Sequence, residues 1–379
     1  MPSSTLRKQL MKNVRSLVVK VGTGVLTGNT GQLDKPLIAR LGRQLALIQG
    51  RGIAVTLVTS GAVGAGMGVA GLASRPRTLP ALQAAAAVGQ PTLMGFYARV
   101  LERYGLHAGQ LLLTRADFED RARYVHIRNT IEALQHLRAI PIINENDTVA
   151  VDELDRFADN DTIAALLANL LRADLLVILS VVDGLLDAEG QRVDLVPRVD
   201  EGALGLVRTD RSKLGSGGMG GKLTAARMVT EAGEAVVVAS GRERDVLLRL
   251  LDGEQLGTIF APAKRKISAR HRWIRNAVRP AGKVVLDDGA VLAVVRNGKS
   301  LLPRGITRVT GAFDRGAIIA LVNAQGETIA RGKSNFSSQE LDKVKGRKSS
   351  EIAAILGHKT FDEAVHRDHL VLIGGKGEQ

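Results

Sequence analysis

Hydrophobic and polar positions between residues 17 and 260 follow two alternating patterns, short aliphatic runs and longer segments with helical spacing. The first run, at 17–19, is followed by a helical pattern that begins near Pro36 and ends at Gly50 and Gly52. Further runs predict strands at 55–59, 111–114, 140–143, 175–179 and 235–239, separated by helices near 81–104, 121–138, 160–172 and 222–232. Strands that alternate with helices form mostly parallel sheets covered on both faces, so this part predicts a three-layer αβα domain.

The pattern changes after residue 261. The following stretch contains Pro262 and the only tryptophan, Trp273, and shows no clear periodicity. After Pro280, short β-like runs separated by Gly-rich turns predict a small barrel-like β domain, with runs at 283–286, 291–294, 306–310, 318–322 and 328–330. The chain therefore divides into a basic N-terminal tail (1–15), an α/β domain (16–261), a basic linker or docking segment (262–279) and a β domain (280–379).

Length and composition set the class of protein. The 379 residues are too many for one ordinary domain and suit two. The absence of cysteine excludes thiol chemistry, disulfides and Cys-zinc sites, and is typical of a reducing compartment. No apolar stretch is long enough for a signal peptide or a membrane span. We therefore expect a soluble cytoplasmic protein without a membrane partner.

The net charge of +14 first suggests a nucleic-acid-binding protein, so its distribution matters. Residues 16–261 carry 26 Lys and Arg against 27 Asp and Glu, which makes the large N-terminal domain neutral. Residues 262–279 contain seven basic residues and no acidic one. The basic excess therefore lies in the tail, the linker and the C-terminal domain.

Carboxylates and amides crowd the end of the fourth predicted strand. The run Asn-Glu-Asn-Asp at 144–147 follows the strand directly, and Asp-Asn-Asp at 159–161 comes shortly afterwards. Asn160 or Asp161 can cap the next helix, but a cap needs only one of these groups. Because ligands bind at the carboxyl ends of strands in α/β sheets, the remaining groups predict the floor of a small-molecule site.

Glycine-rich turns follow the first two strands. Lys20, Gly22 and Gly24 combine a mobile positive charge with backbone amides that can approach an anion, although such turns are common in α/β proteins. At 60–62, Ser-Gly-Ala offers donors at a helix N-terminus, suited to a carboxylate. The run 66–71 matches the pattern GxGxxG, but it starts several residues beyond the strand and no acidic residue follows about twenty positions later. A dinucleotide-binding domain is therefore disfavoured.

A third glycine-rich segment, Gly-Ser-Gly-Gly-Met-Gly-Gly-Lys at 215–222, precedes a helical run. Backbone amides and a lysine at a helix N-terminus favour the binding of phosphate. The alternative without a binding function is a flexible linker. The segment narrowly misses the Walker A motif, because Ser216 replaces a glycine and Leu223 replaces the metal-binding Ser or Thr. The pattern predicts a phosphate site that is not of the P-loop type.

The seven histidines show no metal-binding spacing. His366 and His369, near the C-terminus, are interpreted as structural or surface residues. No Ser-His-Asp arrangement can be argued from spacing.

These motifs give the chain a resemblance to the bacterial glutamate 5-kinases (γ-glutamyl kinases), in which an amino acid kinase domain is followed by a PUA domain. The resemblance covers nearly the whole chain. Its most specific parts lie at 18–23, 58–62, 113–117, 142–147 and 215–222, and in the C-terminal domain at 300–306, 309–311 and 365–368.

The resemblance implies ATP-dependent phosphorylation of the γ-carboxylate of L-glutamate, the first step of proline biosynthesis, with proline as feedback inhibitor. It assigns Lys20 and Lys222 as phosphate-binding lysines and Asp161 as the carboxylate that orients both. Matches to glutamate-binding positions, or neighbours of these, are Ser60, Gly61, Ala62, Asn144, Asp147 and Asn160. Nucleotide-binding positions are Lys20, Gly22, Ser180, Val181, Ser216, Gly217, Gly218, Met219, Gly220, Gly221 and Lys222. We also expect Mg²⁺ to bind together with ATP, without a dedicated set of protein ligands. The protein is expected to be a homo-oligomer, either a dimer or a tetramer.

The chain departs from the family pattern at two places. Ser180-Val181, followed by Gly184-Leu185-Leu186, stands where the family usually has Thr-Asp followed by Gly-Leu-Tyr. Val181 cannot supply the carboxylate, which affects the expected binding of adenine and ribose. Gly220-Gly221 replaces a Ser-Thr pair, leaving backbone amides to compensate for the hydroxyls.

Two alternatives stay open. One is another amino acid kinase, acting on carbamate, acetylglutamate, aspartate or a nucleoside monophosphate; the appended β domain and the run at 144–147 argue against it. The other is an RNA-binding protein, since PUA domains occur in such proteins and the linker is basic. The neutral large domain and the small number of aromatic residues, eleven in the chain (seven Phe, three Tyr and one Trp), argue against RNA as the main partner.

Overall fold

The structure, a computed structural model, describes residues 3–27, 32–149, 160–205, 218–264, 266–358 and 361–373. The chain divides into two compact units, Met1–Lys266 and Ile267–Gln379. Each unit has a hydrophobic core of its own. Among the described residues, no helix combines the length and the hydrophobicity needed to cross a lipid bilayer.

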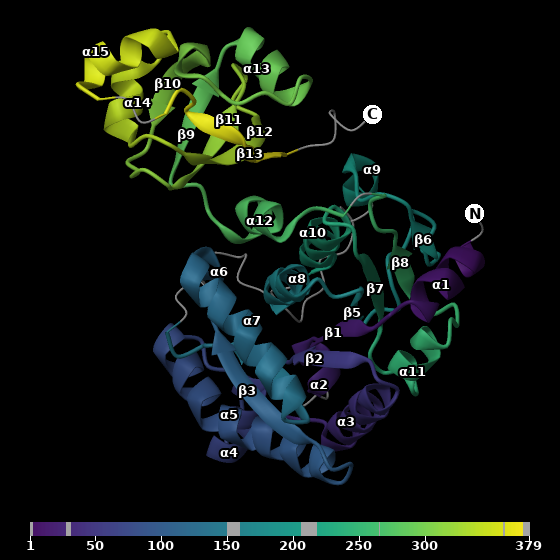
Figure 1. The fold of residues 1–379 in the computed structure, drawn as a ribbon. Helices are drawn as coiled ribbons and strands as arrows, with labels where there is room; N and C mark the ends of the chain where they lie inside the picture. The colour runs from purple at the N-terminus through teal and green to yellow at the C-terminus, as the bar shows by residue number, and fades with distance from the viewer. Residues whose placement is uncertain are drawn as a thin grey trace. The chain divides into compact units, whose positions relative to one another are not determined.

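A mostly parallel sheet forms the centre of the first unit (Figure 1). Within the described residues its strand order is β3-β4-β2-β1-β5-β7-β8-β6, and only the pair β7 and β8 is antiparallel. The central strands β1 and β5 are buried along nearly their whole length, as expected for strands covered on both faces. The strands are β1 (Ser16–Val21), β2 (Ala54–Val58), β3 (His107–Leu113), β4 (Ala139–Glu145), β5 (Leu175–Ser180), β6 (Leu195–Val196), β7 (Ala235–Ser240) and β8 (Thr258–Phe260).

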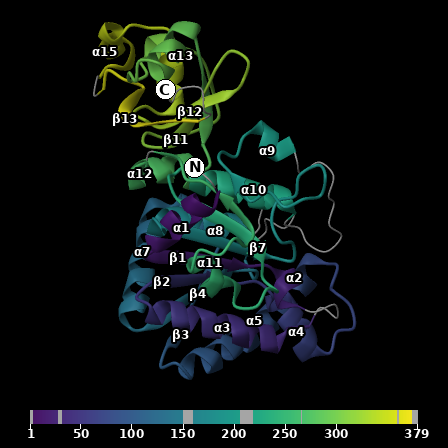
Figure 2. The same cartoon turned by 90° about the vertical axis from the view of Figure 1, so that its right-hand side faces the viewer.

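Helices cover both faces of this sheet (Figures 1 and 2). One face is covered by α3, α5 and α11, and the other by α7, α8 and α10, so the predicted three-layer αβα arrangement is confirmed. The helices are α1 (Ser3–Lys12), α2 (Thr23–Leu26), α3 (Lys35–Gly50), α4 (Ala62–Ala70), α5 (Leu79–Glu102), α6 (Arg115–Glu119), α7 (Arg121–His136), α8 (Asn160–Leu171), α9 (Glu201–Gly205), α10 (Met219–Thr230) and α11 (Val246–Leu251).

Helix α3 illustrates how the sequence sets these elements. Asp34 caps its N-terminus by accepting a hydrogen bond from the backbone N–H of Leu37 (2.9 Å), and Pro36 occupies the first turn. The predicted apolar face is buried against the sheet, with Leu41 and Leu45 among its members. The helix ends at Gly50, as its periodicity predicts.

The glycine run at 66–71 has a packing role. A Cβ atom at Gly66 would lie 1.7 Å from the backbone oxygen of Ala85, and one at Gly89 would lie 1.9 Å from that of Ala62. Helices α4 and α5 therefore approach so closely that only glycine fits at the contact. Gly71, with φ of 65°, ends α4 in the left-handed conformation. Gly66 and Gly71 of the run are therefore explained by packing and backbone conformation, without a bound dinucleotide.

Gly66→Ala should lower the free energy of unfolding by about 1–3 kcal/mol, because overpacking forces the two helices apart. Gly68→Ala is the matched control, since a Cβ atom there would meet nothing within 4 Å. Alanine in an exposed helical position is neutral or stabilises by about 0.5–1 kcal/mol. Urea denaturation of both variants measures the difference, and equal stabilities would contradict the close-packing account.

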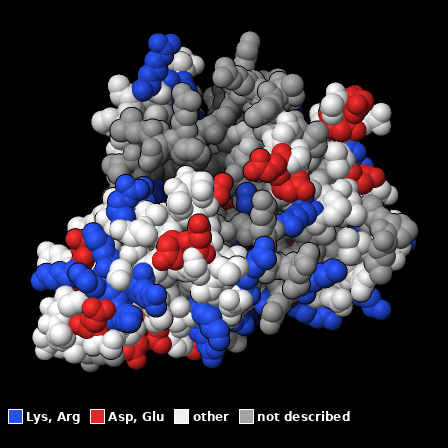
Figure 3. All heavy atoms as spheres, turned by 90° about the horizontal axis from the view of Figure 1, so that it is seen from above, with Lys and Arg blue, Asp and Glu red and all other residues white. Residues whose placement is uncertain are grey.

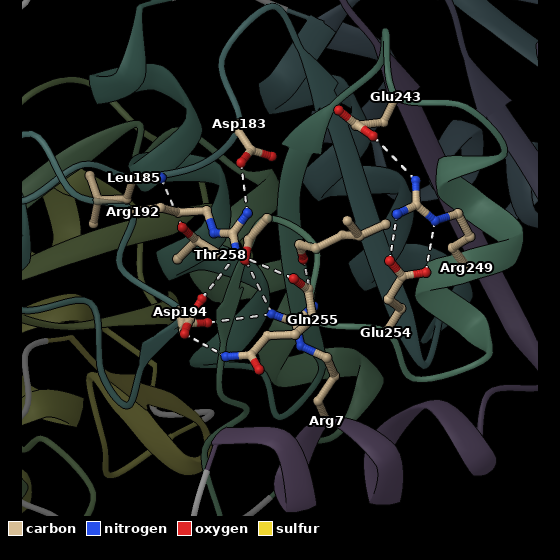
Figure 4. Close-up of polar contacts among 12 residues, drawn as sticks. Arg7, Asp183, Leu185, Arg192, Asp194, Glu243, Arg249, Glu254, Gln255 and Thr258 are labelled. Atoms are coloured by element: carbon tan, nitrogen blue, oxygen red, sulfur yellow. Dashed lines mark hydrogen bonds and ion pairs between the residues drawn. The ribbon is translucent and has the colours of Figure 1, made fainter.

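Within the basic N-terminal segment predicted at 1–15, Ser3–Lys12 form the helix α1. The helix α1 carries Arg7, whose side chain is fully buried. Its guanidinium donates to the backbone oxygens of Leu256 (2.6 Å) and Gly257 (3.2 Å), and Figure 4 shows it extending from α1 toward the segment between Gln255 and Thr258. Burial lowers the pKa of Arg7, while Asp194 opposes that shift. A buried arginine thus anchors α1 to the turn that precedes strand β8.

The second unit is built on a five-stranded sheet of order β10-β9-β11-β12-β13. The β-rich PUA domain predicted for this region is confirmed. Its strands are β9 (Gly282–Leu286), β10 (Ile306–Thr310), β11 (Ile318–Val322), β12 (Thr328–Ser334) and β13 (Val365–Leu372), and its helices include α13 (Asp288–Val295), α14 (Ser338–Val344) and α15 (Ile352–Leu356).

The strand predicted at 291–294 is wrong, because these residues belong to helix α13. Asp287 caps that helix by accepting a hydrogen bond from the backbone N–H of Ala290 (2.7 Å). A short apolar run does not distinguish a strand from a helix by periodicity alone, so the Asp287 cap decides the conformation.

Part of the predicted linker packs on the second unit. Residues 269–277 form helix α12 (Ala269–Arg272) and the π-helical turn η3 (Trp273–Ala277), which contact strands β12 and β13. Ile274 lies in a small apolar cluster with Ile318 and Val371. Arg331 of β12 donates to the backbone oxygens of Arg275 (2.7 Å) and Val278 (3.2 Å). This end of the segment is therefore a docked helical turn.

Several basic side chains on the surface are paired with acidic ones. On the face shown in Figure 3, Lys and Arg of the described residues are interspersed with Asp and Glu. In the first unit, Arg123 pairs with Asp117 (2.8 Å) and Arg43 pairs with Asp245 (2.9 Å). Such pairs reduce the local positive potential that a polyanion would meet.

Candidate active site

Two buried lysines share one buried aspartate at the carboxyl end of the central strands. Lys20 lies near the end of β1, Asp161 in the first turn of α8 and Lys222 in the first turn of α10. Lys20 Nζ is 2.6 Å from Asp161 Oδ1, and Lys222 Nζ is 3.2 Å from Asp161 Oδ2. Three elements far apart in the sequence therefore meet at one carboxylate.

The Asp161 carboxylate is held in its ionised form by the two lysines. Burial by itself would raise the pKa of Asp161, but Lys20 and then Lys222 outweigh it and hold the pKa below its ordinary value of 3.8. Asp161 is fully buried and ionised at neutral pH, so two ammonium groups face one carboxylate. Two buried lysines held around one carboxylate suit an anion such as a phosphoryl group.

Backbone donors lie close to the lysines. Helix α10 begins after Gly218, whose extended backbone (φ −66°, ψ −177°) leaves the first-turn N–H groups of the helix without helical partners. A Cβ atom at Gly22 would lie 3.7 Å from Lys20 Nζ, so the Gly22 turn runs beside the ammonium group. The helix dipole and these amides add to the attraction for an anion.

The predicted nucleotide segment is described only in part. Gly218, Met219, Gly220, Gly221 and Lys222 open helix α10, whereas Ser216 and Gly217 fall outside the described residues. The position of residues 218–222 is compatible with a phosphate site at the N-terminus of α10.

Ser180 and Val181 stand at the end of β5. Ser180 is buried beside Ser240 of the neighbouring strand β7. Val181 is 51% exposed, and a Cβ atom at Gly24 would lie 3.0 Å from its Cγ1 atom. Val181 therefore presents an apolar surface beside the first glycine turn.

Three of the predicted substrate residues form a hydrogen-bonded group. Asn160 Nδ2 donates to Ser60 Oγ (3.0 Å) and to Asn144 Oδ1 (3.2 Å). Ser60 and Asn144 are buried, and they follow or end the adjacent strands β2 and β4. The Asn160 amide thus joins the strand ends to the start of α8, one residue before Asp161.

The other predicted substrate residues border this group. Gly61, with φ of 98°, is the N-cap of α4, and Ala62 is its first residue. The left-handed conformation at Gly61 turns the chain sharply from the strand into the helix. Asp147 is partly buried and lies in the turn after β4. Asp159 is outside the described residues.

Sequence reasoning missed one polar residue of the site. Gln90 lies in the middle of α5 and is buried, and its Oε1 accepts a hydrogen bond from Asn144 Nδ2 (3.0 Å). The available signal was a glutamine on a helical face otherwise made of Ala, Gly, Leu and Tyr. Glutamine is seldom buried without a polar partner, so this position pointed to one.

Comparison with known proteins agrees with the geometry. The amino acid kinase family model matches residues 15–240, and the PUA domain model matches residues 282–356. Among solved structures, an N-acetylglutamate synthase from Neisseria gonorrhoeae, complexed with coenzyme A and N-acetyl-glutamate, aligns with a TM-score of 0.50. It is 16% identical and covers 69% of this chain and 63% of that one, which shows the fold alone.

Curated relatives are similar over almost the whole chain. A glutamate 5-kinase from Citrifermentans bemidjiense is 44% identical over 381 residues, covering 97% of this chain and 100% of the relative. A glutamate 5-kinase from Moorella thermoacetica is 46% identical over 370 residues, covering 96% and 98%. The chain is therefore a kinase and belongs to the glutamate 5-kinase family, with an amino acid kinase domain followed by a PUA domain.

Proposed function

We propose that the enzyme transfers the γ-phosphoryl group of ATP to the γ-carboxylate of L-glutamate, giving γ-glutamyl phosphate. The observation that carries this proposal is the pair of buried lysines, Lys20 and Lys222, held by Asp161. A carboxylate nucleophile is already ionised at neutral pH, so the reaction needs no general base. What it needs is alignment of the reactants and neutralisation of charge on the migrating group, which two ammonium groups provide.

ATP is proposed to bind between the first glycine turn and the start of α10. Lys20 and Lys222 bind the transferred phosphoryl group and Asp161 keeps both ammonium groups in place. The other proposed ATP-binding residues are Gly22, Ser180, Val181, Ser216, Gly217, Gly218, Met219, Gly220 and Gly221. Mg²⁺ enters with the phosphates of ATP and adds to the neutralisation of their charge.

Glutamate is proposed to bind at Ser60, Gly61, Ala62, Asn144, Asp147 and Asn160. Ser60 Oγ accepts from Asn160, so its own hydrogen can donate to a substrate carboxylate. Asn160 Oδ1 is buried and has no hydrogen-bond partner among the described residues, which makes it an acceptor for the α-ammonium group. The Asp147 carboxylate supplies the opposite charge for that group.

The family relationship leads us to propose proline as feedback inhibitor, a place at the first step of proline biosynthesis, and a cytoplasmic homo-oligomer, dimer or tetramer. An RNA partner of the PUA domain would show a steep loss of affinity with added salt, whereas absent or salt-independent binding would dismiss it.

Trapping the acyl phosphate with hydroxylamine tests the proposed reaction directly. We expect hydroxamate from L-glutamate, and kcat/KM lower by about 10–200-fold with aspartate, which is one methylene shorter and misplaces its carboxylate. N-Acetylglutamate has no α-ammonium group for Asn160 and Asp147, so it should react poorly as well. Turnover of N-acetylglutamate or aspartate equal to that of glutamate would assign the enzyme to another amino acid substrate.

A further inference from the structure

We propose that Gln90 is a positioning residue, which holds Asn144 and through it Asn160 so that the site presents a hydrogen-bond acceptor to the α-ammonium group of the substrate. The inference rests on the proposed function and names a determinant of substrate choice in that site. The chain of contacts runs from α5 through β4 to the start of α8, and then to Ser60.

The orientation of the Asn144 amide follows from its neighbours. Its Oδ1 accepts from the backbone N–H of Glu145 (3.0 Å) and from Asn160 Nδ2 (3.2 Å). Its Nδ2 must therefore point the other way, where Gln90 Oε1 accepts it at 3.0 Å. Without that acceptor a buried N–H group would lose its partner, which is unfavourable enough to move the side chain.

The orientation of Asn160 follows in turn. Both hydrogens of its Nδ2 are used, one by Asn144 Oδ1 and one by Ser60 Oγ. Its Oδ1 is consequently left as the acceptor. A reversed Asn160 amide would offer N–H donors in place of that oxygen and would repel an ammonium group. Whether Asn160 presents its oxygen or its N–H groups to the substrate thus depends on Gln90, which acts through its hydrogen bond with Asn144.

Helix packing fixes the position of Gln90. The preceding residue, Gly89, lies so close to α4 that a Cβ atom there would be 1.9 Å from the backbone oxygen of Ala62. Two turns further along α5, Tyr97 Oη lies 3.0 Å from Thr59 Oγ1, next to Ser60. Both contacts hold α5 against the segment that carries Ser60 and Ala62. Gln90 is itself only 8% exposed, so its side chain is packed among its neighbours.

Gln90→Met tests this role, since methionine has a similar shape and no acceptor oxygen. We expect the KM for glutamate to rise about 10–100-fold, with kcat and the KM for ATP changed by less than about threefold. Preference for glutamate over glutarate, which lacks the amino group, should fall by a similar factor. Gln44→Met is the matched control, because Gln44 is also a buried helical glutamine but bonds the backbone N–H of Leu247 (3.0 Å).

A double-mutant cycle separates positioning from general stability. If Gln90 acts through Asn160, then Gln90→Met causes little further loss of kcat/KM in an Asn160→Ala background, whereas independent effects add. If Gln90→Met does not fold, Gln90→Asn is used in its place. Its side chain is one methylene shorter, so the acceptor oxygen lies further from Asn144, and we expect the same results.

An unchanged KM for glutamate, additive effects in the cycle, or equal changes in Gln90→Met and Gln44→Met would each overturn the inference. A wild-type enzyme that forms no γ-glutamyl phosphate would overturn the proposed function itself and this inference with it. Normal wild-type turnover with an unaffected Gln90→Met would overturn the inference alone.

Discussion

Lys222→Ala is expected to lower kcat about 10²–10³-fold, the loss that follows removal of one donor to a transition state. Lys222 lies in the first turn of α10 with its ammonium group 3.2 Å from Asp161. Its charge matters most while negative charge redistributes over the migrating phosphoryl group, so the KM for glutamate should change much less than kcat. Steady-state kinetics with saturating ATP measure both parameters.

Arg227→Ala provides the control on the same helix. Arg227 is partly exposed and pairs with Glu231 one turn later (3.0 Å), so its removal also takes a cation from α10. Surface pairs of this kind contribute about 0–1 kcal/mol, and kcat should stay near that of the wild type. Near-normal turnover of Lys222→Ala, or equal losses in the two variants, would contradict the assigned role.

Asp161→Asn should lower both the free energy of unfolding and kcat. The substitution leaves Lys20 and Lys222 close together without the carboxylate that binds them. Loss of one member of a buried ion pair typically lowers the free energy of unfolding by about 3–5 kcal/mol. The displaced ammonium groups should also lower kcat by about 10²-fold or more, as for a lost transition-state donor. Urea denaturation and steady-state kinetics measure the two effects.

The contribution of Asp161 to the free energy of unfolding depends on pH in a definite direction. Because the folded pKa of Asp161 lies below 3.8, its carboxylate stabilises the fold above that pH, and the contribution is lost as pH falls through the folded pKa. The stability difference between wild type and Asp161→Asn should therefore persist at neutral pH and shrink only in acid.

Asp174→Asn is the control at the other end of the sheet. Asp174 precedes β5 and accepts hydrogen bonds from Ser16 at the start of β1. The same chemical change there should leave kcat near the wild-type value. An Asp161→Asn enzyme as stable and as active as Asp174→Asn would refute the shared-anchor account.

The order of elements in the first unit followed from the hydrophobic pattern. Central strands buried on both faces are continuous aliphatic runs, and β1 and β5 were predicted within a few residues of their ends. Helix α1 was not predicted because its burial depends on Arg7, a charged residue that hydropathy places at the surface. The error at α13 has a different cause, since a short apolar run carries no clear period.

Much of the candidate site could be predicted from the sequence, because the carboxyl ends of parallel strands lie at one edge of a sheet. Ser60 and Asn144 follow or end β2 and β4, and the structure brings them together with Asn160. Sequence spacing alone could not show that Lys222 meets Asp161, since that contact depends on how α8 and α10 pack. The sequence could show that Gln90, on an apolar helical face, needs a polar partner, but it could not identify Asn144 as that partner, because the contact depends on how α5 packs.

The most direct test is a crystal structure of the enzyme with a non-hydrolysable ATP analogue, Mg²⁺ and glutamate. The account predicts that the ammonium groups of Lys20 and Lys222 both contact the γ-phosphate, with the substrate γ-carboxylate facing the phosphorus atom. A γ-phosphate bound away from these two lysines would contradict it.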